Sequence, residues 1–203
     1  MFLNKFSANA VFGAGLLMAG IFAAHPALAG EKITIELKDG PVVIEINDKA
    51  PKHAARIKAL VEGGEYDNVA FHRVIEGFMA QTGDVEFGDL ESGFNAQRVG
   101  TGGSKLPDLE AEFSKETPFK RGTVGMARSA SPNSANSQFF IMFAPAPHLE
   151  GEYTVVGDVV SGMEHVDAIK RGNAAANGVV SEPDRMKKVT VGEMAEQKEA
   201  TKK

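Results

Sequence analysis

Hydrophobic and polar residues alternate in the first regular segment of the chain. Ile33, Ile35 and Leu37 fall on one face of an extended segment, with polar residues between them. A period of two residues is typical of a strand with one buried face. Asp39-Gly40 is a hairpin-turn signal, and residues 42–46 resume the strand pattern. The segment therefore predicts a β-hairpin.

The period changes to that of an amphipathic helix over residues 48–63. Asp48 is a candidate N-cap, Pro51 suits the first turn, and Gly63-Gly64 is expected to end the helix. We expect this helix to cover a sheet with the apolar residues that recur at helical spacing. These are Ala54, Ile57, Leu60 and Val61.

The remaining pattern predicts mainly short strands. Residues 84–107 are rich in glycine and polar residues without any period, which predicts a long surface loop with a functional role. Val166 and Ile169 indicate a second short helix that ends at Gly172. Many short strands with two helices favour a mainly β fold, an antiparallel barrel with helical lids. The further strands are expected at residues 69–75, 78–82, 123–127, 138–143, 153–160 and 186–191.

Residues 1–29 have the layout of a secretory signal peptide. The run over residues 11–24 is apolar or small throughout, and Ala27-Leu28-Ala29 has the form of a cleavage site. The apolar run is shorter than the ~20 residues that a membrane span needs. An uncleaved membrane anchor is the alternative. We expect cleavage after Ala29 and a periplasmic or secreted protein without stable membrane insertion.

The rest of the chain is expected to form one domain over residues 30–192, followed by a charged, disordered tail over residues 193–203. The chain has no cysteine, and its net charge is −5. A net acidic chain without a basic run is a poor nucleic-acid binder, so we expect no nucleic-acid partner. His53 and His165 have no partner at metal-ligand spacing, so we expect no metal and no cofactor. We expect a monomer.

Residues 71–84 contain the most informative chemistry of the chain. This segment combines one arginine, Arg73, with the apolar side chains of Phe78 and Met79 and the amide of Gln81. It contains no plausible nucleophile, metal cluster or phosphate-binding loop. A fixed cation, an apolar pocket and a neutral hydrogen-bonding arm suit a reaction that breaks no covalent bond.

The same segment begins a series of motifs that resembles the cyclophilin family of peptidyl-prolyl isomerases, over about residues 33–191. The resemblance implies a closed eight-stranded antiparallel barrel capped by two helices. It also implies isomerisation of X-Pro bonds in proline-containing polypeptides and unfolded exported proteins, whose folding would be assisted. The motifs are Phe71-His72-Arg73-Val74-Ile75, Gly77-Phe78-Met79, Gln81, Gly83-Asp84, Gly100-Thr101-Gly102-Gly103, Met126-Ala127 and Ser137-Gln138-Phe139-Phe140-Ile141.

The resemblance also implies roles for individual residues. Arg73 and Gln81 are the expected catalytic residues: Arg73 donates to the proline nitrogen and Gln81 bonds the substrate backbone. The pocket for the proline ring is expected from Phe78, Met79, Phe140 and Leu149. The other expected substrate-binding residues are Gly100 in a rim loop, Ala127 and Arg128 through their main chain, Gln138, His148 and Tyr153.

The sequence departs from the common pattern of the family in three places. His148 stands where a tryptophan is frequent, and Tyr153 stands where a histidine is frequent. One additional residue lies between Met126 and Gln138 relative to the commonest eukaryotic form. Because imidazole is smaller and more strongly hydrated than indole, His148 predicts weak cyclosporin binding.

Strand parity decides whether the two catalytic candidates meet. A three-residue turn at Glu76-Gly77-Phe78 pairs Ile75 with Met79 and therefore places Arg73 opposite Gln81 on one face. A two-residue turn would separate them, so we predict the three-residue turn.

Two other functions compete with the enzyme. One is a non-catalytic proline-peptide binding or chaperone module on the same fold. A weaker one is a secreted hydrolase that uses a serine of residues 129–137, although no Gly-x-Ser-x-Gly motif is present.

Overall fold

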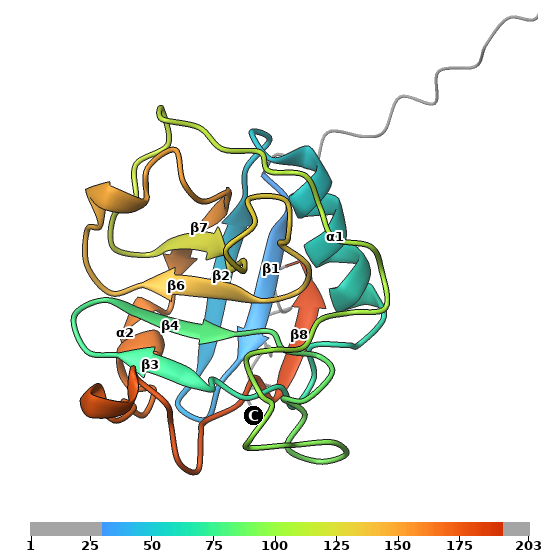
Figure 1. Cartoon of the computed structure of the whole chain (residues 1–203), viewed down its shortest axis with the longest axis vertical. Helices are drawn as coiled ribbons and strands as arrows, with labels where there is room; N and C mark the ends of the chain where they lie inside the picture. Colours follow the sequence, from blue (N-terminus) through green and yellow to red (C-terminus); the bar gives the residue numbers. More distant parts are fainter. Residues whose placement is uncertain (1–29, 193–203) are drawn as a thin grey trace, which may run out of the picture.

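The computed structural model describes residues 30–192 and shows a curled antiparallel sheet with two α-helices (Figure 1). Its eight strands have the order β3-β4-β6-β5-β7-β2-β1-β8. The predicted signal peptide and tail lie outside the described residues. The strands are β1 (Lys32–Glu36), β2 (Pro41–Ile46), β3 (Arg73–Ile75), β4 (Met79–Thr82), β5 (Thr123–Met126), β6 (Phe139–Met142), β7 (Val155–Ser161) and β8 (Lys188–Val191). The helices are α1 (Pro51–Glu62) and α2 (Met163–Asp167), with the 3-10 helices η1 (Pro147–Leu149) and η2 (Ala174–Ala176).

The sheet is open, so the expected closed barrel is wrong. Strands β3 and β8 are its two edges, and within residues 30–192 no ladder of hydrogen bonds joins them. The loop after α2 covers the edge of β3 instead. Val74 N donates to Gly178 O at 2.8 Å, and Gly172 N donates to Val74 O at 2.9 Å. Because this loop satisfies the peptide groups of the edge, no closing strand is needed there.

The predicted first hairpin is confirmed, whereas several other predicted elements have different bounds, most of all β3 and α2. Strand β3 begins only at Arg73, because Val69 and Ala70 make isolated bridges to two other segments of the chain. Helix α2 ends at Asp167, before the expected Gly172. Gly172 allows two segments of the chain to lie close together, since a Cβ atom at this position would lie 1.8 Å from Gly178 O.

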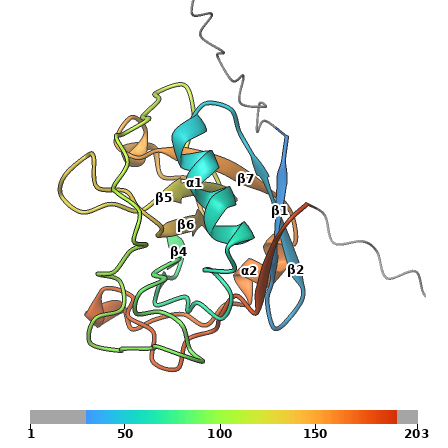
Figure 2. The same cartoon turned by 90° about the vertical axis from the view of Figure 1, so that its right-hand side faces the viewer.

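The main core fills the inside of the curled sheet and is closed by α1 (Figure 2). The predicted apolar face of α1 is confirmed, because its four residues are buried in one cluster with Ile33, Ile35 and Leu37 of the first hairpin. Val166 of α2 joins the same cluster. Among the helices of residues 30–192, none is long and apolar enough to cross a membrane.

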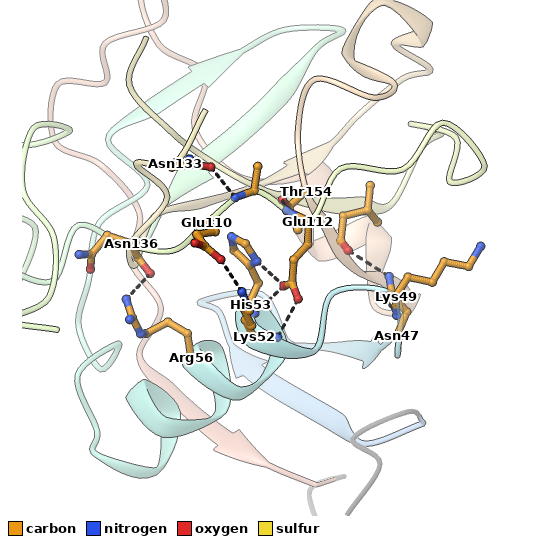
Figure 3. A network of polar contacts seen from close by, with 12 residues as sticks. Asn47, Lys49, Lys52, His53, Arg56, Glu110, Glu112, Asn133, Asn136 and Thr154 are labelled. Carbon is orange, nitrogen blue, oxygen red and sulfur yellow. Dashed lines mark hydrogen bonds and ion pairs between the residues drawn. The ribbon is translucent and has the colours of Figure 1, made fainter. Parts of the chain in front are cut away.

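A distant glutamate caps the start of α1, so the expected cap by Asp48 is wrong. The N-cap position is Ala50, which has no side-chain acceptor, and Pro51 occupies the first turn as predicted. Glu112 accepts hydrogen bonds from Lys52 N and His53 N, each at 3.1 Å (Figure 3). A carboxylate at this place satisfies peptide N–H groups that have no partner within the helix.

The predicted loop over residues 84–107 has no helix or strand, but it is organised around a buried carboxylate. Asp84 is fully buried. Its Oδ1 accepts from Glu86 N and Phe87 N, and its Oδ2 accepts from Gly100 N at 2.6 Å and Gly102 N at 3.0 Å. These four bonds give a long segment without secondary structure a defined shape.

Candidate functional site

The hairpin of β3 and β4 brings the two catalytic candidates together. Ile75 pairs with Met79 and Arg73 pairs with Gln81, which confirms the predicted three-residue turn. Gly77 lies within this turn with a φ of 68°, a conformation that glycine adopts without steric cost. Arg73 Nη1 donates to Gln81 Oε1 at 3.1 Å.

Asn177 holds the other side of the Arg73 guanidinium. Arg73 Nε donates to Asn177 O, and Nη2 donates to Asn177 Oδ1, both at 3.0 Å. Asn177 has a φ of 53°, in the left-handed region that asparagine tolerates better than most residues. Guanidinium has five N–H donors. The hydrogen bonds within residues 30–192 engage three of them and leave two for a ligand.

A chain of amides continues from Arg73 along the site. Gln81 Nε2 donates to Gln138 Oε1 at 3.0 Å, and Gln138 Nε2 donates to Gly102 O at 2.8 Å. The side-chain amides of Gln81 and Gln138 therefore each accept a hydrogen bond through oxygen and donate one through nitrogen, so all the bonds point the same way from Arg73 to Gly102. This alternation defines the orientation of the Gln81 amide, which would otherwise be free to turn over.

A small cavity of about 170 Å³ lies beside Arg73. Its walls combine the guanidinium with apolar and aromatic side chains, which suits a compact apolar ring that also has a polar atom. Nine of the predicted site residues line it: Arg73, Phe78, Met79, Gln81, Ala127, Arg128, Phe140, Leu149 and Tyr153. We call it the apolar cavity.

A second cavity of about 350 Å³ adjoins the first, and most of the residues that line it have polar side chains. It shares Gln81, Ala127 and Arg128 with the apolar cavity, so the two are neighbours along one surface. Predicted site residues Gly100 and Gln138 lie here rather than in the apolar cavity. The other lining residues are Thr101, Gly102, Ser129, Ser134 and Asn136. We call it the polar cavity.

Comparison with known proteins identifies the family to which this arrangement belongs. Residues 32–191 match the model of the cyclophilin type peptidyl-prolyl cis-trans isomerases. The chain belongs to this family. Its activity is accordingly that of a cyclophilin-type peptidyl-prolyl cis-trans isomerase.

The relatives of this cyclophilin include bacterial and plant proteins. A probable peptidyl-prolyl cis-trans isomerase of Brucella abortus (strain 2308) is 59% identical over 191 residues, which cover 92% of this chain and 97% of the relative. Peptidyl-prolyl cis-trans isomerase CYP18-1 of Arabidopsis thaliana is 34% identical over 160 residues, 78% of this chain and 94% of that protein.

A solved structure shares the fold. The cyclophilin type isomerase of Cryptosporidium parvum, crystallised in the presence of the dipeptide Ala-Pro, has a TM-score of 0.69 and 26% identity. The match covers 80% of this chain and 99% of that one.

The apolar cavity of this cyclophilin rests on a second apolar cluster, outside the main core. Phe140 stacks on Phe119 with ring centroids 5.9 Å apart, and it meets Tyr153 edge-on at 5.8 Å. Gly125 makes this possible, because a Cβ atom there would lie 2.5 Å from Phe140 and 2.8 Å from Phe119. Met79 and Leu149 belong to the same cluster.

The sequence predicts that glycine at position 100 leaves room for a peptide. The backbone conformation at this position also favours glycine. Its φ is 94°, which L side chains rarely adopt. A Cβ atom would also lie 3.1 Å from the ring of buried His72. Gly100 therefore lets the rim loop lie close to the hairpin that contains Arg73.

His148 lies at the rim of the site in η1 and lines neither cavity. Its ring stacks on Phe78 with centroids 6.0 Å apart and an interplanar angle of 26°. The structure thus places His148 behind one wall of the apolar cavity, with its own side chain exposed.

The wall of the polar cavity is attached to helix α1 (Figure 3). Arg56 Nη1 donates to Asn136 O at 3.3 Å, and Nη2 donates to Pro107 O at 2.7 Å. Nearby, His53 Nδ1 lies 2.6 Å from Glu112 Oε2. Burial is the largest cause that lowers the pKa of His53, and the Glu112 carboxylate opposes it. Helix α1 therefore supports the wall of the polar cavity from behind through the guanidinium of Arg56.

Sequence reasoning missed three residues of this site. Asn177 has no motif around it and reaches Arg73 only because the loop after α2 covers the edge of β3. Phe119 and Gly125 act through Phe140, and neither stands out from its neighbours in the sequence. Within residues 30–192, no group of three or more potential ligand side chains is arranged to hold a metal ion.

Replacement of Asn177 by glycine tests whether the Asn177 side chain positions the guanidinium of Arg73. Glycine keeps the left-handed backbone and the main-chain acceptor but removes Oδ1, so one of the three hydrogen bonds of Arg73 is lost. We expect kcat/KM on an X-Pro peptide to fall about 10-fold, the equivalent of one charge-assisted hydrogen bond of about 1.4 kcal/mol. Asn177→Asp retains an acceptor and is the matched control. Equal activity of Asn177→Gly and wild type would contradict a positioning role for this side chain.

Proposed function

We propose that this isomerase acts on X-Pro bonds of exported proteins and assists their folding. The observation that supports the reaction best is the guanidinium of Arg73, held by three hydrogen bonds at the edge of the apolar cavity. The remaining steps follow from the chemistry of the X-Pro bond.

The barrier to rotation about a peptide bond comes from delocalisation of the nitrogen lone pair into the carbonyl. It amounts to ~20 kcal/mol, so uncatalysed exchange takes tens to hundreds of seconds. In the twisted transition state the lone pair returns to nitrogen, which becomes a good hydrogen-bond acceptor only then. A donor aimed at this nitrogen therefore binds the transition state better than either planar ground state, which is the condition for catalysis.

Arg73 is suited to be that donor. Its charge persists over the physiological pH range, and its planar fork has defined N–H directions. Two N–H groups remain after the bonds to Gln81 and Asn177. Because these partners already fix the guanidinium, little reorganisation is needed when the transition state forms.

The apolar cavity supplies the second part of the proposal. Proline is a compact ring without an N–H group, and the aromatic and aliphatic walls around Phe140 suit such a ring. The relative that was crystallised in the presence of Ala-Pro supports the proposal that proline-containing peptides are the ligands. Gln81 is proposed to bond the substrate backbone through Nε2, which has a second N–H besides the one given to Gln138.

The two competing functions are less well supported. The loop serines bond to one another or to main-chain carbonyls: Ser129 Oγ donates to Ser134 Oγ, and Ser137 Oγ donates to Gly83 O, both at 2.7 Å. Neither bond provides a base that would activate a nucleophile, which disfavours a hydrolase. A non-catalytic binding module would have the same apolar cavity but no use for a donor as firmly fixed as Arg73.

Replacement of Arg73 by alanine tests the reaction. We expect kcat/KM for X-Pro isomerisation to fall at least ~100-fold, about 2.7 kcal/mol of transition-state stabilisation. The assay follows cis-trans exchange of a proline peptide without added metal or nucleotide, and circular dichroism checks that the variant is folded. Normal turnover by Arg73→Ala would refute the role of this side chain. Wild-type protein that binds the peptide without accelerating its exchange would favour the binding module.

Export is proposed from the signal-peptide pattern of residues 1–29. We expect the protein isolated from its native cell envelope to begin at Gly30, because Ala27-Leu28-Ala29 fits the small residues that signal peptidases require. Mass spectrometry of the intact protein measures this directly. A chain that still contains residues 1–29 and sediments with membranes would support the anchor instead.

Weak cyclosporin binding is proposed from His148. A tryptophan at this position would offer a larger apolar face and an indole N–H at the rim, so His148→Trp should tighten cyclosporin binding by roughly 1–3 kcal/mol. Peptide isomerisation should change little, since His148 lines neither cavity. Titration of the drug against both proteins in one assay checks this. Nanomolar inhibition of the wild type, or equal affinities, would show that another residue controls drug binding.

A further inference from the structure

The two cavities form a locally positive region on an acidic protein. The chain has a net charge of −5. The residues that line the two cavities nevertheless include Arg73 and Arg128 and no aspartate or glutamate. Arg73 takes part in the reaction proposed above, whereas the guanidinium of Arg128 has no role in it. The side chain of Arg128 lines both cavities.

Arg128 is held in place by its neighbours. Its Nε donates to Glu152 O and its Nη1 donates to Ser129 O, both at 3.0 Å. The guanidinium carbon lies 4.6 Å from the ring centroid of Tyr153, a cation–π contact. The side chain is only 13% exposed. These contacts engage two of the five N–H groups and fix the direction of the others.

The carboxylates around the polar cavity, Glu152 beside Arg128 and Asp84 behind Gly100 and Gly102, compensate this charge only in part. Glu152 Oε2 lies 3.6 Å from Arg128 Nη2, but the Glu152 side chain is 66% exposed. Such solvated pairs are weak. Asp84 is fully buried, and its oxygens already accept four backbone N–H groups. An incoming anion therefore meets an arginine whose existing partners are mostly neutral carbonyl oxygens.

The polar cavity suits a charged or strongly polar side chain. Besides Arg128 it is lined by the hydroxyl-bearing Thr101, Ser129 and Ser134. An apolar side chain placed there would remove water from these groups without replacing its hydrogen bonds, which is costly. A carboxylate offers acceptors to the N–H groups of the Arg128 guanidinium that have no hydrogen bond to the protein.

We propose that Arg128 makes this isomerase select substrates with an aspartate or glutamate close to the proline. The inference rests on the proposed function, with proline in the apolar cavity. Successive residues of an extended peptide are about 3.3 Å apart. Because the two cavities share walls, a residue one or two positions from the proline reaches the polar cavity. The acidic side chain then lies against Arg128.

Matched peptides test the selectivity. Peptides that differ only in glutamate, glutamine or lysine, placed one or two residues before or after the proline, are compared by kcat/KM at low salt. At one of these positions we expect glutamate to exceed glutamine about 2–5-fold, the range of a partly exposed ion pair of ~0.5–1 kcal/mol. Lysine should fall below glutamine. The difference should appear in KM, since the contact is the same in ground and transition states, and it should shrink in 1 M salt.

Three variants assign the effect to Arg128. Arg128→Gln should bring the ratio of glutamate to glutamine peptides to about 1, whatever its activity on the neutral peptide. Arg128→Lys keeps the charge and should retain a preference for glutamate. Glu152→Gln removes the nearest competing carboxylate and should increase the preference.

The outcomes separate this inference from the proposed function. Equal kcat/KM for glutamate and glutamine peptides at every position in the wild type would overturn the inference alone. The same ratio in Arg128→Gln as in wild type would also overturn it. Failure to accelerate exchange of any peptide would overturn the proposed function, and this inference with it.

Discussion

The register of the β3–β4 hairpin is the constraint on which the site depends. A three-residue turn pairs Arg73 with Gln81, whereas a two-residue turn would place these side chains on opposite faces of the sheet. From this pair the amide chain extends through Gln138 to Gly102 and so connects the hairpin with the rim loop. Asn177 completes the hold from the opposite side. A single register thus decides the direction of the proposed catalytic donor.

Strand β6 connects the site with the body of the protein. Its alternate residues face two different apolar clusters: Phe139 and Ile141 belong to the main core, while Phe140 and Met142 belong to the cluster under the apolar cavity. All four residues are buried. Because both faces of β6 are covered, the position of Phe140 is determined by packing on both sides of the sheet, which makes the cavity a rigid part of the fold.

Buried polar groups organise the parts of the site that lack secondary structure. Asp84 gathers four peptide N–H groups and so shapes the rim loop that contains Gly100. Arg56 and Glu112 connect helix α1 to the segments behind the polar cavity (Figure 3). Such groups are costly to bury unless every partner is in place. The structure of the loops at the site consequently depends on these particular polar residues, as the structure of the core depends on its apolar residues.

The sequence by itself determined the local features of this protein. Period-two alternation predicted the first hairpin, helical spacing predicted the buried face of α1, and parity predicted that Arg73 meets Gln81. These features depend on residues close together in the chain, so a pattern can reveal them. Tertiary structure alone decided that the sheet stays open, that Glu112 rather than Asp48 caps α1, and that Asn177 holds Arg73. The two contacts join residues at least 59 positions apart in the chain, and the open sheet depends on how whole strands are arranged. No local period carries that information, because such contacts arise only when the complete core sets the distance between segments.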